Sequence, residues 1–517
     1  MLVHTPSNSL LLNVPDPLAL RAILPQSKLL DHADWNLAVK LTLDATKVLR
    51  NVGIEAPAPI RYSYRWPGKY KPFAHQIVMS EFLTMHRRCF NLSEMGTAKT
   101  NSALWAADWL METGRVDKAL VLSPLSTLDR VWANDLFETL MHRTCTILHG
   151  TVDKRLQRLN VDVDFYIMNH DGLKISRVME EILRRPDINL VIVDEASMFR
   201  NHSTAKYKAL AKLCKRRDVR LWMMTGTPCP NDPTDAWALA KLVSPSRVPE
   251  YFGGFKRATM LNISQFKWVP KADAYNTAFA ALQPAVRFKK ADCLDLPPVT
   301  VQDRQCDMTK EQRDAFDSLR KTMVHMAQSG EKITAANAAD KIGKLRQILC
   351  GAIKIDDEYE TLDHAPRLNV LLECIEQADA KVLIIAPFKG IVRALEKELS
   401  PHYTVGVLNG DVSAGARDAI IKAFKGGKDP HILLCHPAVM SHGLNLTEAD
   451  MMISYAPIYS NDQWQQVTER FNRAGQTRKM TVVRMAAHPL EWQIYKMLDN
   501  RQTTQDSILN LFKQVTE

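Results

Sequence analysis

The sequence predicts an α/β protein with two lobes, each built on a parallel sheet, and a helical insertion between them. Short apolar runs alternate with helical patterns over residues 66–245 and again over residues 366–517, whereas residues 246–365 interrupt that alternation. Buried strands separated by helices are typical of parallel sheets. We therefore assign residues 1–65 to a small accessory region, 66–245 to a first lobe, 246–365 to an insertion and linker, and 366–517 to a second lobe.

Composition and charge narrow the class of protein. A chain of 517 residues can form several hydrophobic cores, and its 46% hydrophobic and 24% charged content is typical of a soluble globular protein. The formal net charge of +10 favours a polyanionic partner, with a basic protein that has no nucleic-acid role as the alternative. The nine cysteines are scattered without metal-ligand spacing, and no apolar run is long enough to cross a membrane. We therefore expect a soluble intracellular protein with unpaired thiols.

Residues 1–65 contain repeated prolines around one helical pattern. That pattern runs from Trp35 to Val48 and places apolar side chains at Leu37, Val39, Leu41 and Leu43. We interpret this region as a small accessory domain, and a brace on the next domain is the alternative.

The stretch from Ser93 to Thr100 follows a short apolar run and precedes a helical pattern, so it is predicted as a strand-to-helix turn. Backbone N–H groups at a helix start point at an anion, Lys99 can reach the β and γ phosphates, and the Thr100 hydroxyl can hold magnesium. Ser93 and Ala98 stand where glycines usually occur, so an ordinary polar helix start is the alternative. The nucleotide-binding residues are expected to be Glu94, Met95, Gly96, Thr97, Ala98, Lys99 and Thr100.

Gln76 lies at a predicted helix start just upstream of this turn. A glutamine amide both donates and accepts hydrogen bonds, so it can read both polar edges of adenine. We therefore add Gln76 to the nucleotide-binding residues, with an ordinary surface glutamine as the alternative.

Polar residues follow four apolar runs of the first lobe, and the carboxyl ends of parallel strands meet at one edge of a sheet. The pair Asp194 and Glu195 is the most informative, because a carboxylate directly after an apolar strand is costly unless it is solvated or paired with a cation. We predict that Asp194 holds magnesium and that Glu195 orients and deprotonates the attacking water. Capping of the following helix is the alternative. The four runs are residues 119–122, 165–168, 190–193 and 221–224.

Basic and aromatic residues interleave between Phe255 and Lys290, and two helical patterns follow, over residues 310–329 and 335–349. This mixture suits a groove that tracks a sugar-phosphate backbone. A solvated face with a few core aromatics is the alternative.

The second lobe has its own apolar runs and neither a phosphate loop nor a pair of carboxylates after a strand. A helix predicted from about Asn461 to Ala474 places Gln466, Arg470 and Arg473 on one face. Arginines held rigidly in this way can stabilise the charge of a transferring phosphoryl group, and an exposed arginine pair is the alternative. The predicted strands of this lobe cover residues 382–386, 405–408, 432–435, 451–455 and 481–485.

These stretches together resemble the Swi/Snf-like branch of helicase superfamily two, the double-stranded DNA translocases with two RecA-like lobes. The resemblance runs from about Pro72 to the C-terminus. The stretch from Glu94 to Thr100 resembles the family's Glu-Met-Gly-x-Gly-Lys-Thr loop, and Ser441 to Asp450 contains its Gly-Leu-Asn-Leu-Thr sequence. The stretch from Gln466 to Gln476 matches its Gln-x-x-x-Arg-x-x-Arg-x-Gly-Gln signature.

The resemblance implies a DNA-dependent ATPase that uses ATP and magnesium and binds double-stranded DNA, including forked or branched DNA, through backbone contacts that tolerate any sequence. The resemblance implies that the protein does not bind a membrane and that it does not need to form an oligomer. The alternatives are a strand-separating or branch-migrating helicase and a clamp that binds ATP and DNA without hydrolysis. The DNA contacts that the resemblance implies are Ser123, Asn169, Lys389, Asn409 and Ser441.

Two departures from the family pattern bear on the mechanism. Ala98 replaces the glycine before the lysine and adds a methyl group where the backbone approaches phosphate. Ser197 replaces the histidine common after Asp-Glu-Ala, which puts in doubt how ATP binding is reported to the DNA site. Neither change removes a charge that the chemistry needs, so hydrolysis is still expected.

Overall fold

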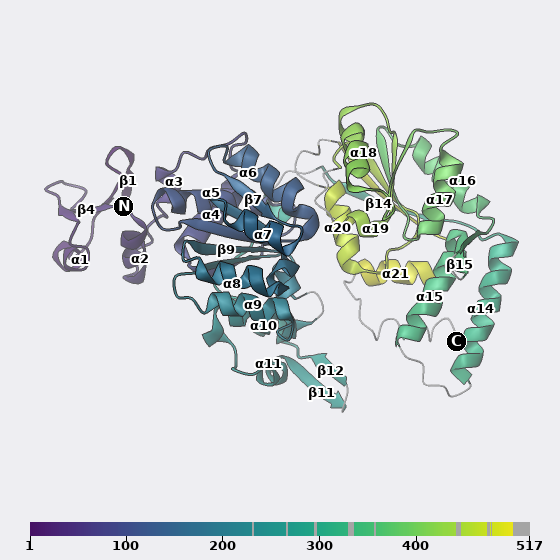
Figure 1. The fold of residues 1–517 in the computed structure, drawn as a ribbon, viewed down its shortest axis with the longest axis horizontal. Coiled ribbons are helices and arrows are strands. Elements are labelled where there is room, and N and C mark those ends of the chain that lie inside the picture. Colours follow the sequence, from purple (N-terminus) through teal and green to yellow (C-terminus); the bar gives the residue numbers. More distant parts are fainter. Residues whose placement is uncertain are drawn as a thin grey trace. The chain divides into compact units, whose positions relative to one another are not determined.

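The computed structural model describes residues 1–229, 232–264, 267–293, 297–328, 335–355, 358–440, 446–472, 476 and 478–499. The chain divides into two compact units, Met1–Leu294 and Asp295–Glu517, each built around a parallel sheet with helices against it (Figure 1). This arrangement confirms the predicted α/β fold class. Among the helices formed by the described residues, none has both the length and the apolar character needed to cross a bilayer.

The N-terminal region forms an antiparallel sheet of order β1-β2-β4-β3 with its own small core. The predicted helix from Trp35 to Val48 is wrong in its first half. Leu37, Val39 and Leu41 are buried whereas Lys40 is exposed, so the pattern has the two-residue period of a strand. The elements are β1 (Leu2–His4), β2 (Ser9–Leu12), α1 (Pro17–Ile23), β3 (Lys28–Leu29), β4 (Leu37–Lys40), α2 (Leu43–Asn51) and α3 (Ile60–Ser63).

The sheet of the first unit has seven parallel strands in the order β13-β5-β10-β9-β6-β8-β7. The four strands predicted for the first lobe are confirmed as β6, β8, β9 and β10. The strands are β5 (Arg88–Asn91), β6 (Lys118–Ser123), β7 (Cys145–Leu148), β8 (Phe165–Asn169), β9 (Ile188–Asp194), β10 (Arg220–Met224) and β13 (Ala285–Val286).

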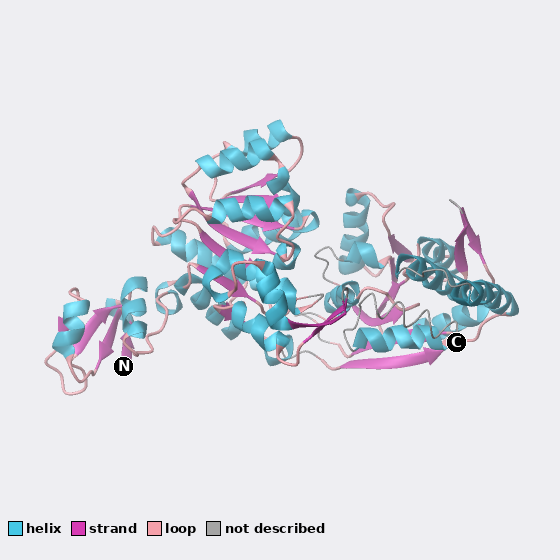
Figure 2. Cartoon of the chain, turned by 90° about the horizontal axis from the view of Figure 1, so that it is seen from below, coloured by secondary structure: helices cyan, strands magenta, loops and turns pink. Residues whose placement is uncertain are grey.

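Helices cover both faces of this sheet (Figure 2), and a two-stranded hairpin follows α11 (Figure 1). The helices are α4 (Ala74–Met85), α5 (Lys99–Glu112), α6 (Asn134–Thr139), α7 (Val152–Leu159), α8 (Ser176–Arg184), α9 (Ala205–Cys214), α10 (Ala236–Val243), α11 (Phe252–Thr259), α12 (Ala274–Ala281) and α13 (Lys290–Cys293). Two short helical turns bear on the site, Leu128–Ala133 and Ala196–Phe199, and the hairpin is β11 (Met260–Ser264) with β12 (Lys267–Pro270).

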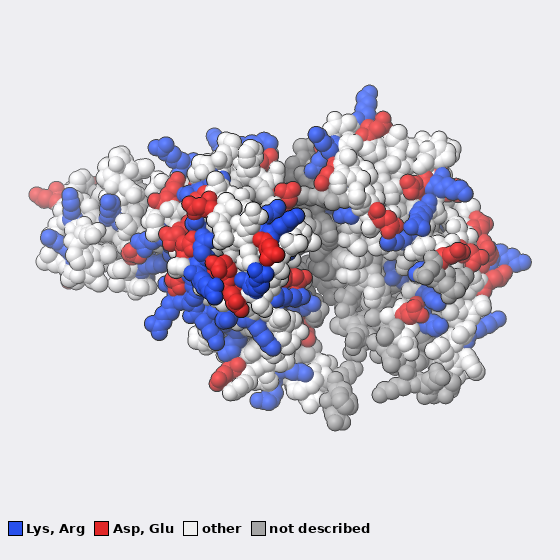
Figure 3. Space-filling view, viewed as in Figure 1, with Lys and Arg blue, Asp and Glu red and all other residues white. Residues whose placement is uncertain are grey.

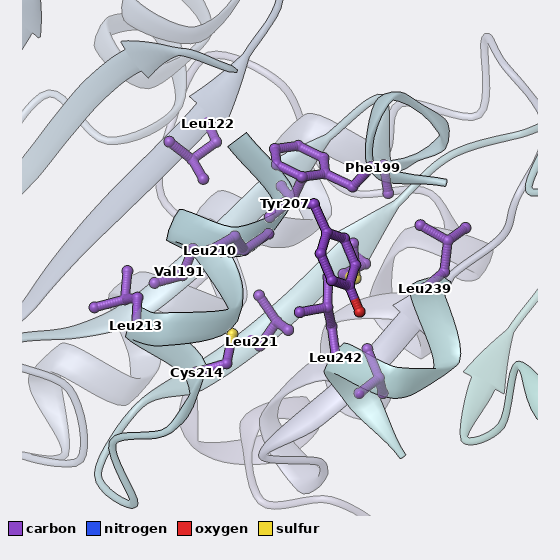
Figure 4. Close-up of a cluster of buried hydrophobic side chains, with 14 of the residues drawn as sticks. Leu122, Val191, Phe199, Tyr207, Leu210, Leu213, Cys214, Leu221, Leu239 and Leu242 are labelled. Carbon is purple, nitrogen blue, oxygen red and sulfur yellow. The ribbon is translucent and has the colours of Figure 1, made fainter. Parts of the chain in front are cut away.

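Alternate residues of β9 face two separate cores. Leu190 and Ile192 pack into the cluster that includes α5, whereas Val191 and Val193 pack into the cluster that includes α9 and α10. Figure 4 shows the cluster that includes α9 and α10, in which Leu210 lies close to Val191 and Tyr207 lies between Phe199 and Leu242. A strand buried on both faces reads as a continuous apolar run, which explains why the sequence revealed it.

The sheet of the second unit has six parallel strands in the order β14-β21-β20-β17-β19-β18. Its five predicted strands and the two helices predicted over 310–329 and 335–349 are confirmed. The strands are β14 (Val299–Gln305), β17 (Lys381–Ile385), β18 (Val405–Leu408), β19 (Ile432–Cys435), β20 (Ala449–Ser454) and β21 (Met480–Ala486), with a hairpin of β15 (Ala352–Ile355) and β16 (Glu358–Thr361).

A buried ion pair joins two helices of the second unit, α16 (Ala365–Glu376) and α21 (Pro489–Asp499). Arg367 donates to both oxygens of Glu491, at 2.8 and 2.9 Å, and both side chains are at most 1% exposed. The helices are α14 (Lys310–Gln328), α15 (Ala335–Cys350), α16 (Ala365–Glu376), α17 (Lys389–Leu399), α18 (Ala414–Gly426), α19 (Pro437–Met440), α20 (Asn461–Phe471) and α21 (Pro489–Asp499).

Residues 246–365 contribute to both units. The segment supplies β13, which pairs with β5 in the first sheet, and β14, which pairs with β21 in the second. Its backbone therefore belongs to both sheets, and the helical pair α14 and α15 packs within the second unit.

Candidate nucleotide-binding site

Strand register brings the predicted polar residues to one edge of the first sheet. Met224 is opposite both Asn91 and Asp194, so β5, β10 and β9 end in line. Ser123 is opposite Asn169 at the ends of β6 and β8. The predicted meeting of the phosphate loop with the carboxylates at this edge is confirmed.

The phosphate loop connects β5 to α5, and its lysine lies within the loop. Lys99 Nζ donates to the carbonyl oxygens of Ser93 at 2.7 Å and Glu94 at 2.9 Å. Thr100 follows in the first turn of α5. Phosphate oxygens can replace these carbonyls as acceptors, because they satisfy the same ammonium group and carry charge.

Gly226, just after β10, packs against the backbone of the phosphate loop. A Cβ atom at this position would lie 3.3 Å from the backbone nitrogen of Met95 and 3.5 Å from the Cα of Glu94. The buried Thr225 donates its N–H to the carbonyl of Asn91 at 3.1 Å. Glycine at residue 226 therefore allows the close packing of this strand end against the loop.

Ala98 adopts a left-handed backbone conformation, with φ 55° and ψ 47°, immediately before α5. This region costs a residue with a Cβ atom about 1–2 kcal/mol, whereas glycine enters it freely. The left-handed backbone explains why the family pattern has glycine at this position. Ala98 keeps the same turn at an energetic cost.

Gln76 is 3% exposed, and both ends of its amide have partners. Its Oε1 accepts the backbone N–H of Phe73 at 2.9 Å, and its Nε2 donates to the carbonyl of Ala98 at 3.2 Å. Gln76 thus joins the start of α4 to the phosphate loop. Contact with adenine, the role suggested by the sequence, stays a prediction.

Asp194 and Glu195 end β9 beside the loop. Asp194 Oδ2 accepts the indole N–H of Trp132 at 3.0 Å and the Ser123 hydroxyl at 3.5 Å. His170 bonds the backbone carbonyl of Asp194 through Nε2 at 2.8 Å, and burial lowers the pKa of this histidine. The backbone of Glu195 adopts the left-handed conformation, with φ 51° and ψ 54°, so the chain turns sharply directly after β9.

Two carboxylates at the end of a strand supply the hard oxygen ligands that Mg²⁺ prefers. The backbone strain at Glu195 is of the kind that concentrates at functional sites. Asp194 and the hydroxyl of Thr100, in the first turn of α5, therefore fit a magnesium–nucleotide complex in their chemistry, with the Glu195 carboxylate next to Asp194.

A segment from Pro284 to Lys290 runs beside β5 and the phosphate loop. Phe90, Leu92 and Glu94 donate their backbone N–H groups to the carbonyls of Pro284, Val286 and Phe288 at 2.8–3.0 Å. Lys290 returns its own N–H to Glu94 Oε2 at 2.9 Å.

The Lys290 side chain lies over Gly96 in the phosphate loop. A Cβ atom on Gly96 would be 3.4 Å from Lys290 Cε and 3.7 Å from Nζ, so the missing side chain allows this approach. The sequence interpretation grouped Lys290 with a basic stretch and missed this placement. The pairing of residues 285–286 with β5 brings the chain beside the loop, where Lys290 is partly buried and Lys289 is exposed.

The predicted DNA contacts of the first unit have partners within the protein. Ser123 is fully buried, and its hydroxyl bonds the hydroxyl of Thr127. Asn169 Oδ1 accepts from the guanidinium of Arg155 at 3.1 Å. Ser197, where the family has histidine, is 9% exposed. The DNA-binding roles of Ser123 and Asn169 stay predictions.

In the second unit, Lys389 Nζ pairs with Asp411 at 2.7 Å, and Asn409 Oδ1 accepts the backbone N–H of Asp411 at 2.9 Å. Gln466 and Arg470 lie on α20, whose N-cap is Ser460; the Ser460 hydroxyl accepts the N–H of Gln463. The predicted residues Arg473 and Ser441 lie outside the described residues.

Comparison with known proteins places these features in a family. The chain matches the SNF2-related domain over residues 76–352 and the helicase conserved C-terminal domain over residues 366–475. An archaeal solved structure, the Sulfolobus solfataricus SWI2/SNF2 ATPase core in complex with dsDNA, is 22% identical with a TM-score of 0.41 and covers 87% of this chain and 96% of that one.

Three curated relatives illustrate the range of matching proteins. A putative ATP-dependent helicase/translocase of Bacillus subtilis is 26% identical over 82% of this chain and 47% of its own length. An uncharacterized ATP-dependent helicase of Mycoplasma genitalium is 23% identical, over 82% of this chain and 41% of its own length. A putative protein of Acyrthosiphon pisum secondary endosymbiont phage 1 is 24% identical, over 86% and 98% respectively. The chain thus spans less than half of these two bacterial relatives and nearly all of the phage protein. Because the SNF2-related match alone covers more than half of the chain, this protein belongs to the SNF2-related family.

Proposed function

We propose that this protein is a DNA-dependent ATPase that uses ATP and magnesium to translocate on or remodel double-stranded DNA. One observation carries the proposal, namely the register that aligns the ends of β5 and β9 and so brings the loop of Lys99 to the same sheet edge as Asp194. Membership of the SNF2-related family supports it.

In this proposal the first unit binds the nucleotide. Lys99 exchanges the Ser93 and Glu94 carbonyls for the β and γ phosphates, and Thr100 and Asp194 hold magnesium. Glu195 accepts the proton of the attacking water. Lys290 adds a second ammonium group beside Gly96, close to the phosphates.

Gln466, Arg470 and Arg473 are proposed to act on the same nucleotide from the second unit. The guanidinium groups of Arg470 and Arg473 would stabilise the charge of the transferring phosphoryl group, an effect worth about 10³–10⁵ in rate in related chemistry. Bound magnesium supplies electrostatic stabilisation of the leaving phosphate.

DNA is the proposed polyanionic partner. Figure 3 shows Lys and Arg side chains gathering over the first unit around α8 and α9, where the exposed bases include Lys208, Lys212, Lys215 and Arg217. Together with the net charge of +10, these bases support backbone contacts that weaken as salt rises and read no base sequence.

ATP turnover measured against duplex, single-stranded, forked and RNA substrates tests the proposal. We expect duplex DNA to stimulate ATP turnover by the wild type and not by the Glu195→Gln variant. Glutamine has nearly the same shape as glutamate but cannot act as the general base. Equal turnover with and without every nucleic acid would contradict it. Greater activity on forks, with strand separation, would instead favour the helicase alternative.

The strained Ala98 favours one competing function, a clamp that binds ATP and DNA without hydrolysis. The same assay separates the two functions, since a clamp binds ATP and releases no phosphate with any substrate.

A further inference from the structure

Four cations lie at the amino-terminal edge of the first sheet, opposite the edge that carries the phosphate loop. Arg220 is the first residue of β10, and Arg87 immediately precedes β5. Lys47 lies on α2 of the accessory region, and Arg115 lies just after α5. We call Lys47, Arg87, Arg115 and Arg220 the amino-edge cluster.

Arg220 is the buried member of the cluster. It is 9% exposed, and its NH1 atom is buried with no hydrogen-bond partner among the described residues. Burial and the like charges of Arg87 and Arg115 lower the pKa of Arg220 to about 10. Burial and the charge of Arg220 likewise lower the pKa of Lys47. These cations therefore repel one another across a partly desolvated site, an arrangement that an anion stabilises.

One carboxylate already lies beside the cluster. Asp44 accepts two hydrogen bonds from Arg115, at 3.1 and 2.6 Å, and so joins α2 to the end of α5. This bidentate pair occupies Arg115 and leaves the cluster with an excess of positive charge around the orphaned nitrogen of Arg220.

We propose that the amino-edge cluster binds a phosphate group at a site separate from the nucleotide site. A guanidinium fork matches the oxygens of a phosphate, and arginine is the preferred residue for such recognition. The phosphate is either a backbone phosphate of DNA or a free phosphate, which offer the same oxygens to these cations. The accessory region supplies part of the site through Lys47, which gives residues 1–65 a role in anion binding.

Thermal unfolding of the full chain tests the site directly. The Lys99→Ala background removes phosphate binding at the loop, and inorganic phosphate is titrated against chloride at constant ionic strength. The melting temperature is expected to rise with phosphate, and the rise should disappear when Lys47→Met and Arg87→Met are combined. Arg184→Met, an exposed arginine on α8, is the matched control and should retain the rise.

A second variant guards against misfolding as an explanation. Asp44→Asn removes the competing carboxylate, so it should strengthen phosphate binding severalfold. Every variant in this comparison carries Lys99→Ala, so differences in phosphate binding between the variants do not come from the phosphate loop. Phosphate that stabilises no more than chloride, together with an Asp44→Asn variant that binds no better, would overturn the proposal.

Duplex affinity, measured on the same variants, identifies the source of the phosphate. A roughly tenfold loss in the Lys47→Met, Arg87→Met chain identifies a DNA backbone phosphate, and unchanged duplex affinity with lost phosphate stabilisation identifies a free phosphate. Only the duplex arm rests on the proposed function. Failure of every chain to bind DNA would therefore contradict that function and leave the phosphate titration to decide on the site.

Discussion

The indole N–H of Trp132 donates to Oδ2 of Asp194 across 3.0 Å, from a tryptophan that is fully buried. The other carboxylate oxygen, Oδ1, accepts the backbone N–H of Glu195 at 3.1 Å. Both oxygens of Asp194 are thus oriented by groups that do not contact the nucleotide in our proposal. Such supporting hydrogen bonds hold a metal ligand in one geometry.

Trp132→Phe should raise the magnesium concentration needed for half-maximal ATP turnover by about tenfold, because it removes that donor. Titration of magnesium at saturating ATP and DNA measures the effect. Trp222→Phe is the matched control, since the Trp222 indole donates instead to the carbonyl of His86. An equal change in both variants would show that lost packing, rather than the bond to Asp194, is responsible.

Lys290→Met should weaken ATP binding by about tenfold, because it removes the ammonium group that lies over Gly96. Methionine keeps the length of the side chain and removes its charge. Equilibrium binding is the measurement, and AMP, which lacks the terminal phosphates, should bind the variant and the wild type equally. Lys289→Met removes a neighbouring exposed charge, and a similar loss in this control would contradict the assignment.

Ala98→Gly should leave the first unit as stable as before, or stabilise it by up to about 1 kcal/mol, because relief of the left-handed strain offsets the entropy of glycine. Ala103→Gly within α5 should destabilise it by about 1 kcal/mol. Thermal unfolding of the two variants provides the comparison. Destabilisation of equal size in both would mean that the strain at Ala98 is unimportant.

Glu491→Gln should lower the free energy of unfolding by about 3–5 kcal/mol, since it leaves the buried Arg367 without a counter-charge. Urea denaturation of the variant measures this loss. Asp303→Asn breaks the partly exposed pair with Arg484 and should cost within about 1 kcal/mol. A small effect at Glu491 would show that water reaches the buried arginine.

Stability should fall as pH drops below about 6.5, the usual pKa of histidine. Burial lowers the pKa of His170 in the folded chain, so the unfolded chain binds more protons below that pH and gains relative stability. His170→Gln should reduce the loss in melting temperature between neutral and mildly acidic pH, whereas the exposed His402→Gln should leave it unchanged. Other buried or partly buried histidines whose pKa is lowered by burial contribute to the remaining decline, namely His75, His86, His436 and His488.

The central strands could be predicted because burial on both faces leaves a continuous apolar run, as in Leu190 to Val193. The two edge strands of the first sheet lack that signal. Cys145 to Leu148 forms β7 at the sheet edge with only Leu148 buried, and β13 has two residues, so neither was identified from the sequence. Leu37 to Leu41 was assigned to a helix because a short apolar stretch fits both periods until its buried face is known.

The chemistry of the candidate site was more predictable than its support. The lysine, the threonine and the paired carboxylates can be recognised in the sequence from their residue types and from their positions after predicted strands. The indole of Trp132 and the chain around Lys290 reach the site through tertiary pairing, and no local pattern encodes that pairing. The roles of the individual site residues stay predictions until the variants above are measured.

Three of the hydrogen bonds between residues 90–94 and residues 284–288 join main-chain donors to main-chain acceptors. The Ser93 hydroxyl adds a side-chain bond by accepting the N–H of Phe288. Alanine scanning removes that side-chain bond and leaves the three main-chain bonds intact. Proline at Glu94, by contrast, deletes the N–H that Phe288 accepts. A movement of the phosphate loop on nucleotide binding would thus be transmitted through main-chain hydrogen bonds. Side-chain substitutions, the usual means of tracing such coupling, do not remove these bonds.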